Sequence, residues 1–393
     1  RVGKGRWGVG GADVISPKRT EKQGIVFWSS ALASAAAKQE AGNLVEAAHL
    51  YERILSRIPQ QPQALTMRAS IAYQQGRDQA GDRYLDHAID ALTLALDEMP
   101  AQAPEHAGLA NLLLARDRTT EAMRRLAAVD LPLKPVRATA ADFHTRCARA
   151  RLAMRPSILM VTMPKSASES LWNILAGGLD LGQCHVSIGL FPNCGLVPSR
   201  LRQMALGGVV AKEHIRPDPS NLAMLADAGI DRALVHVRDP RQAVLSWAHF
   251  VRNDVSRRML APIWRRIVPP AGVLQRDLDH VIDWCLDHYL PLLVDFVQGW
   301  HRLDRNPTPG RGGISIRCLT FERFVADRDG YLADLLDFYG LGSFNEAAVE
   351  QAATIHWRRG QIGEWRRVFT TDQRRRATNA LPAALGEHFG WAP

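Results

Sequence analysis

A short loop between a predicted strand and a predicted helix holds the residue types of this chain best suited to binding an anion. The apolar run 157–162 has the pattern of a buried strand, and Met163 and Pro164 end it. The residues that follow are small or polar and include one cation: Lys165, Ser166, Ala167, Ser168, Glu169 and Ser170. Backbone N–H groups at a helix N-terminus, together with a lysine, attract phosphate or sulfate groups. The sequence therefore predicts an oxyanion loop at residues 163–170, although the Walker A pattern GxxxxGK[ST] is absent.

Two later segments repeat the arrangement of a predicted strand followed by charged residues, and a fourth is rich in arginine. The strands are predicted at 208–212 and 233–237, and the arginine-rich segment spans 358–370. The residues concerned are Lys212, His214, Arg238, Ser246, Arg358, Arg359 and Gly360. Because the carboxyl ends of parallel strands share one edge of a sheet, we expect the first three segments to lie close together.

The four segments, taken in order, resemble those of sulfotransferases that use 3′-phosphoadenosine 5′-phosphosulfate (PAPS). Residues 164–170 are similar to the family pattern PKSGTTW, and 358–366 resembles its late RKGxxGDW loop. The resemblance covers roughly residues 156 to 391 and implies a PAPS donor without a metal. It further implies that Lys165, Ser166, Ala167, Ser168, Glu169 and Ser170 bind the 5′-phosphosulfate, and that Arg238, Ser246, Arg358, Arg359 and Gly360 bind the 3′-phosphate. His214 would be the catalytic base, Lys165 would stabilise the leaving phosphate, and Lys212 would stabilise the transferring sulfuryl group.

The oxyanion loop also departs from the family pattern. Ala167 replaces a glycine, so we expect the turn to avoid positive φ there. Glu169 would repel the donor unless it turns outward or pairs with a cation. Ser170 replaces a tryptophan that stacks on adenine, and Trp172 is two residues away. Residues 251–276 are basic and predict either an acceptor-side lid or a solvated amphipathic helix.

The first part of the chain has a helical pattern. Residues 1–24 predict a flexible basic arm, and 25–131 predict helix pairs in which Gly42 recurs as Gly76. That spacing of 34 residues is typical of tetratricopeptide repeats, and a plain helical bundle is the alternative. Such repeats bind a protein segment or another subunit. We expect residues 1–131 to be dispensable for reaction with small acceptors.

The rest of the chain has the pattern of an α/β fold. Residues 132–155 predict a linker with a helix, and 156–393 predict a P-loop-like parallel sheet with flanking helices. Strands are predicted at 157–162, 208–212, 233–237 and 314–319.

Composition narrows the class of protein. The 393 residues carry a net charge of +9, which a nucleotide donor explains in part. Nucleic acid is not favoured as a partner, because the arginines are spread through helical patterns. Five scattered cysteines indicate reduced thiols and a cytoplasmic location. Residues 18–37 have some features of a signal peptide, but the helical pattern continues beyond them. No run reaches the roughly 18 apolar residues of a transmembrane helix.

Several functions fit these patterns. We expect a PAPS-dependent sulfotransferase that acts on a hydroxyl group of a small alcohol, a phenol or a glycan. A protein-tyrosine sulfotransferase with its acceptor delivered by the repeats is an alternative. A nucleotide-dependent kinase and a non-catalytic helical-repeat scaffold are the others. The kinase would need the missing Walker A motif, whereas Glu169 in the oxyanion loop is the best support for the scaffold.

Overall fold

The computed structural model describes seven stretches of the chain: residues 30–98, 103–136, 138–253, 264–305, 313–342, 344–345 and 361–391. The predicted basic arm lies outside these residues, as do Arg358, Arg359 and Gly360.

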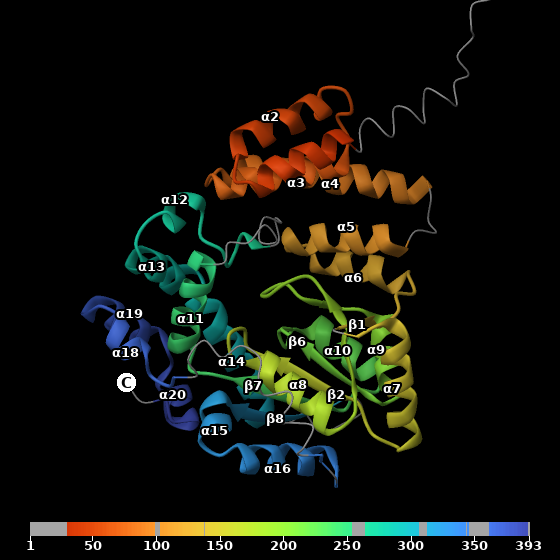
Figure 1. Cartoon of the computed structure of the whole chain (residues 1–393), viewed down its shortest axis with the longest axis vertical. Helices are drawn as coiled ribbons and strands as arrows, with labels where there is room; N and C mark the ends of the chain where they lie inside the picture. Colours follow the sequence, from red (N-terminus) through yellow and green to blue (C-terminus); the bar gives the residue numbers. More distant parts are fainter. Residues whose placement is uncertain are drawn as a thin grey trace, which may run out of the picture.

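A six-stranded, mostly parallel sheet forms the centre of the molecule (Figure 1). In spatial order its strands are β1 (Lys134–Pro135), β3 (Gly182–His185), β6 (Val209–Glu213), β2 (Ile158–Thr162), β7 (Arg232–Val237) and β8 (Ser315–Thr320). Only the β1–β3 pair is antiparallel. The four strands predicted from the sequence are confirmed to within a residue. The linker contributes an edge strand that the sequence did not predict, and a small hairpin, β4 (Ser187–Ile188) and β5 (Gly195–Leu196), lies outside the sheet.

Both faces of the sheet are covered, which explains why its central strands β2 and β7 are largely apolar. The helices around the sheet are α7 (Ala140–Leu152), α8 (Ser168–Gly178), α9 (Pro198–Ala205), α10 (Pro219–Asp227), α11 (Pro240–Asn253), α12 (Ala271–Leu274), α13 (Leu278–His288), α14 (Leu290–Arg305), α15 (Phe321–Ala326) and α16 (Arg328–Tyr339). Leu159 and Val161 of β2 belong to a core shared with α9, α11, α13 and α14. Ile158 and Met160 face a second core shared with α8 and α16. Three short helices follow: α18 (Trp365–Val368), α19 (Thr371–Ala380) and α20 (Ala383–Phe389).

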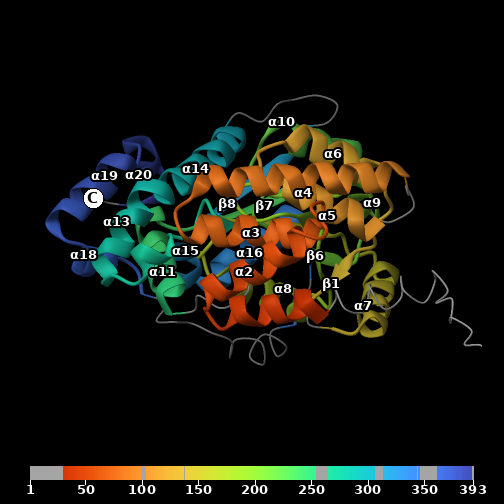
Figure 2. The same ribbon diagram turned by 90° about the horizontal axis from the view of Figure 1, so that it is seen from above.

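Helix pairs lie over the sheet, as the views from the side and from above both show (Figures 1 and 2). Residues 30–40 are helical and are followed by α2 (Leu44–Leu55), α3 (Pro62–Gln74), α4 (Asp78–Glu98), α5 (Ala103–Ala115) and α6 (Thr119–Ala127). The turns within the pairs each contain one left-handed residue: Gly42 with φ +81°, Gly76 with φ +68° and Asp117 with φ +61°. The 34-residue spacing therefore corresponds to equivalent turns. Membership of the tetratricopeptide class stays a prediction.

The helix pairs and the sheet share buried contacts. Leu131 and Val197 belong to one apolar cluster with residues of α5 and α6. The Asn193 side chain donates to the Leu114 carbonyl (3.0 Å) and to the Asp117 carboxylate (2.7 Å). The two parts therefore pack as neighbours with a common core.

Candidate functional site at the carboxyl edge of the sheet

The oxyanion loop connects β2 to α8 through two left-handed residues. Lys165 has φ +65° and Ala167, the N-cap residue of α8, has φ +61°. The expectation that alanine would keep this turn out of the positive-φ region is therefore wrong. An alanine in the left-handed region costs roughly 1–2 kcal/mol relative to a relaxed backbone. Contacts elsewhere in the fold must hold the loop in this shape.

Ser166 is the buried centre of these contacts. Its hydroxyl donates to the Met163 carbonyl at 2.6 Å. The buried imidazole of His236 donates from Nε2 to the Ser166 carbonyl at 2.8 Å, and the Tyr331 hydroxyl donates to His236 Nδ1 at 2.9 Å. Burial lowers the pKa of His236 to about 4, so the ring is neutral at pH 7. Because the Ser166 hydroxyl donates its proton inside the protein, it is not free to donate to a bound PAPS molecule.

Arg238 joins the oxyanion loop to the late segment. Its guanidinium donates to the Lys165 carbonyl at 3.0 Å and to the Gln361 carbonyl at 3.1 Å, and it stacks over the Phe321 ring at 4.1 Å. Arg238 is buried. The described end of the late segment therefore lies beside the oxyanion loop, as the resemblance implies. The predicted phosphate ligands Arg358, Arg359 and Gly360 directly precede Gln361 but lie outside the described residues.

The residues that follow Arg238 in the sequence anchor the C-terminal part of the chain. Arg241 forms a bidentate ion pair with Asp239, donates to the Trp391 carbonyl at 3.0 Å and stacks over Trp365 at 4.2 Å. The Trp365 indole donates to the Asp239 carboxylate at 3.2 Å. The Arg-Asp-Pro-Arg segment therefore contributes one arginine to the oxyanion loop and uses the other to hold α18 and the residues after α20.

His214 is the residue that directly follows β6, next to the end of β2. Its Nδ1 donates to the Thr162 carbonyl at 2.6 Å, and the Thr162 hydroxyl lies 3.1 Å from the same nitrogen. A carbonyl accepts only, so the proton is on Nδ1 and Nε2 carries the lone pair. Burial, and then the positive charge of Lys212, lower the pKa of His214 to about 4. The partly exposed ring is therefore a neutral base over the physiological pH range.

Glu169 of the oxyanion loop pairs with Lys212. The two side chains form an ion pair across the loop and β6, and the Lys212 ammonium lies 5.0 Å from the centre of the Trp172 ring. The carboxylate thus has the cationic partner that would reduce its repulsion of a donor. The same contact partly neutralises Lys212, which is buried, so its predicted role toward a sulfuryl group needs this pair to open.

Other predicted residues differ in their surroundings. Lys165 is partly exposed, and its ammonium lies 4.2 Å from the centre of the Phe250 ring. Ser246 lies on α11, one turn before Phe250, and is partly exposed. Ser168 and Ser170 are buried in the first turn of α8. Trp172 is also buried, and its indole donates to the Val210 carbonyl at 2.9 Å. It therefore stabilises the core and is not placed to stack on a nucleotide base.

Sequence reasoning missed three residues that shape this site. His236 and Tyr331 hold the Ser166 carbonyl, and Thr162 fixes the His214 tautomer. The only available signal was a histidine inside an otherwise apolar strand, since a buried polar group requires partners.

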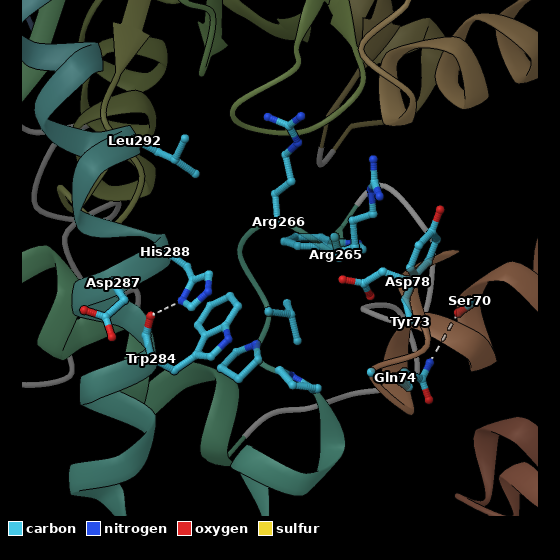
Figure 3. Close-up of a pocket in the computed structure, with 15 residues that line it drawn as sticks. Ser70, Tyr73, Gln74, Asp78, Arg265, Arg266, Trp284, Asp287, His288 and Leu292 are labelled. Atoms are coloured by element: carbon cyan, nitrogen blue, oxygen red, sulfur yellow. Dashed lines mark hydrogen bonds between the residues drawn. The ribbon is translucent and has the colours of Figure 1, made fainter. Parts of the chain in front are cut away.

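A cavity of about 450 Å³ lies between the helix pairs and the α13 region (Figure 3). Ser70, Tyr73 and Asp78 line one side, and Trp284 and His288 line the other. No residue of the oxyanion loop lines it within the described part of the chain. The cavity is thus separate from the cluster of predicted site residues.

The segment that borders this cavity is attached to the helix pairs. Arg265 donates to the Asp82 carboxylate at 2.8 Å and to the Ala115 carbonyl at 3.1 Å, and Arg266 pairs with Asp117. Of the basic segment 251–276, residues 254–263 lie outside the described part of the chain. Arg265 and Arg266 connect this segment to the helix pairs. Neither form predicted from the sequence, a lid or a solvated helix, included such contacts.

The comparisons with known proteins yield a weak structural similarity. No family model and no curated protein matches the sequence. A solved structure of the mouse sulfotransferase SULT7A1, complexed with PAP, is similar to the chain with a TM-score of 0.41 and 14% identity, over 60% of this chain and 88% of the mouse chain. A TM-score of this size does not establish a shared fold.

Within the described residues, no helix is long and apolar enough to cross a membrane. The same residues contain no group of three or more His, Cys, Asp and Glu side chains that could hold a metal ion.

Proposed function

We propose that this protein transfers a sulfuryl group from PAPS to a hydroxyl acceptor. The observation that carries the proposal is the position of Lys165, His214 and Arg238, each within three residues of the end of one of three adjacent parallel strands. Ligands of open α/β sheets bind at this edge. The first three segments that resemble the sulfotransferase family thus end at one edge of the sheet, which supports the proposal.

The residues present suit an anionic donor. The first turn of α8 provides backbone N–H groups and the positive end of the helix dipole, and Lys165 adds a full charge. The Lys212–Glu169 pair places a carboxylate near the loop but does not leave it uncompensated. PAPS, when bound, supplies the activated sulfuryl group and a phosphate leaving group.

His214 and Lys165 have complementary roles in the proposed reaction. His214 Nε2 accepts the proton of the acceptor hydroxyl while the oxygen of that hydroxyl forms a bond to the sulfur atom of PAPS. The bond between that sulfur and the 5′-phosphate oxygen breaks, and the negative charge that develops on the phosphate is stabilised by Lys165. The Thr162 carbonyl keeps the His214 proton on Nδ1, and after proton transfer it stabilises the imidazolium.

Calorimetric titration with 3′-phosphoadenosine 5′-phosphate (PAP) tests donor binding. Metal-independent binding supports the proposal. Preference for ATP with Mg²⁺ would favour the kinase, and no nucleotide binding would favour the scaffold. The acceptor stays open between small alcohols or phenols, glycans and protein tyrosines delivered by the helix pairs.

Turnover tests the role of His214. The full chain is incubated with radiolabelled PAPS and panels of phenols, oligosaccharides and tyrosine peptides. His214→Ala should abolish sulfation and keep PAP affinity, whereas the matched variant His144→Ala, at an exposed position on α7, should keep both. Unchanged turnover in His214→Ala would exclude it as the base.

A further inference from the structure

The opposite edge of the sheet has a hollow of about 410 Å³ where β2, β6 and β7 begin. Among the residues that line this hollow are two apolar and four charged ones: Met154, Leu206, Arg151, Arg155, Asp231 and Arg232. They come from the end of α7 and from the segments that lead into these three strands. Figure 1 shows α7 on one side of the sheet and α11, which follows Arg238, on the other. The hollow and the proposed catalytic site therefore lie at opposite ends of the same strands.

Apolar side chains protrude around this hollow. Met154 is 88% exposed and Leu206 is 66% exposed, and both line it. Leu152, two residues before Met154 in the last turn of α7, is 86% exposed. Soluble proteins do expose single apolar residues, but a group of them marks an interaction site.

The backbone at Met154 supports the same conclusion. Met154 N–H donates to the Arg151 carbonyl and Arg155 N–H donates to the Ala150 carbonyl, both at 2.9 Å, which is the Schellman arrangement at a helix end. The backbone at this position of a Schellman motif is left-handed, so the residue there is usually glycine. Met154 occupies it with φ +53°. A bulky apolar residue is thus held in an unfavourable conformation and presented to solvent.

The surroundings of these side chains are positively charged. Arg151 donates to the Gly207 carbonyl at 3.0 Å, and Arg155 donates to the Leu179 carbonyl. Carbonyl partners fix the position of a guanidinium without cancelling its charge. Arg232 also lines the hollow, and its nearest carboxylate oxygen, on Asp231, is 3.9 Å from its Nε. Three arginines thus face one carboxylate at the rim.

We propose that this basic apolar edge docks peripherally on an anionic lipid membrane. Protruding leucine and methionine side chains insert among acyl chains, and clustered arginines are attracted to acidic headgroups. A protein partner is less well supported, because tryptophan and tyrosine dominate the anchor positions of protein interfaces, whereas the exposed apolar side chains here are aliphatic. Docking would direct the carboxyl edge of the sheet away from the lipid. If the proposed function holds, the enzyme would act on acceptors in the aqueous phase.

Vesicle co-sedimentation of the full chain tests this proposal. The probes are phosphatidylcholine vesicles with and without phosphatidylserine, at low and high salt. We expect binding to the vesicles that contain phosphatidylserine, and weaker binding at high salt because ions screen surface charges. Met154→Glu and Leu206→Glu should each lower the partition coefficient about tenfold, since each replaces an inserted apolar group with an anion.

Leu94→Glu is the matched control, because Leu94 is 55% exposed on α4, away from the hollow. It should leave vesicle binding unchanged, and circular dichroism should show that all three variants are folded. Absence of binding to phosphatidylserine vesicles would overturn the proposal, as would an equal loss in Leu94→Glu. A dimer that Met154→Glu dissociates, without any vesicle binding, would assign this edge to self-association instead.

Discussion

The titration of His236 allows a quantitative prediction about the stability of the protein. The ring is fully buried, donates to the Ser166 carbonyl and accepts from Tyr331, and its pKa is lowered by burial to about 4. In the unfolded chain the pKa of a histidine is about 6.5. Between these two values the unfolded state binds a proton that the folded state does not. The free energy of unfolding therefore decreases as pH falls from about 6.5 toward 4.

The size of the effect follows from the two pKa values. Between pH 7 and pH 5, one such histidine lowers the free energy of unfolding by about 2 kcal/mol. His214, whose pKa is also lowered to about 4, adds a contribution of the same sign. Its ring is partly exposed, so we expect that contribution to be smaller.

His236→Gln removes the titrating group and keeps an N–H donor for the Ser166 carbonyl. Urea unfolding at pH 7 and at pH 5 should show that the pH-dependent loss of stability shrinks by about 2 kcal/mol. The variant is expected to be less stable at pH 7, because the ring contacts with Phe324 and Tyr331 are lost. That offset does not affect the difference between the two pH values. His87→Gln, at an exposed position on α4, is the control. An unchanged pH dependence in His236→Gln would refute the reasoning.

Two further predictions concern the oxyanion loop and the helix pairs. Arg238→Ala should weaken PAP binding by about 1.5–3 kcal/mol in calorimetric titration, because it removes a charged donor, its bond to the Lys165 carbonyl of the loop and its bond to the Gln361 carbonyl of the late segment. Arg238→Lys should restore only part of the affinity, and full affinity in Arg238→Ala would remove this residue from the site. Deletion of residues 1–131 should lower the melting temperature, because Val197 would lose the apolar contacts of α5 and α6. An unchanged melting temperature by calorimetry would show that the rest of the chain does not depend on the helix pairs for its stability.

Much of the sheet was predictable because its strands carry their signal locally. The runs 157–162 and 233–237 are largely apolar, as strands covered on both faces are. β1 and β3 were missed for the opposite reason: one has two residues, and the other, Gly182–His185, contains glycine and polar residues. Their pairing depends on long-range contacts that a local pattern does not encode.

The site was predictable at the level of topology but not at the level of contacts. Lys165, His214 and Arg238 were expected at one edge because each follows a predicted strand. The bond from His236 to Ser166 joins residues 70 positions apart, and the pair of Lys212 with Glu169 joins residues 43 apart. Residue types alone do not indicate such partners. They also gave the wrong backbone conformation for Ala167, because the usual preference of alanine is overridden by the surrounding fold.

The strained shape of the oxyanion loop bears on which of its atoms would bind a donor. Lys165 and Ala167 are both left-handed, at a cost of order 1–3 kcal/mol each, and the bonds from His236 and Arg238 to consecutive carbonyls hold that shape. The Ser166 hydroxyl points inward to the Met163 carbonyl, so the fold preserves the path of the backbone and not the side-chain hydroxyls. A loop that binds through its N–H groups and one lysine tolerates alanine in place of glycine and glutamate in place of a hydroxyl residue. On this view the departures from the family pattern are compatible with a phosphosulfate site while Lys212 holds the Glu169 carboxylate, and in that state Lys212 does not serve the sulfuryl group.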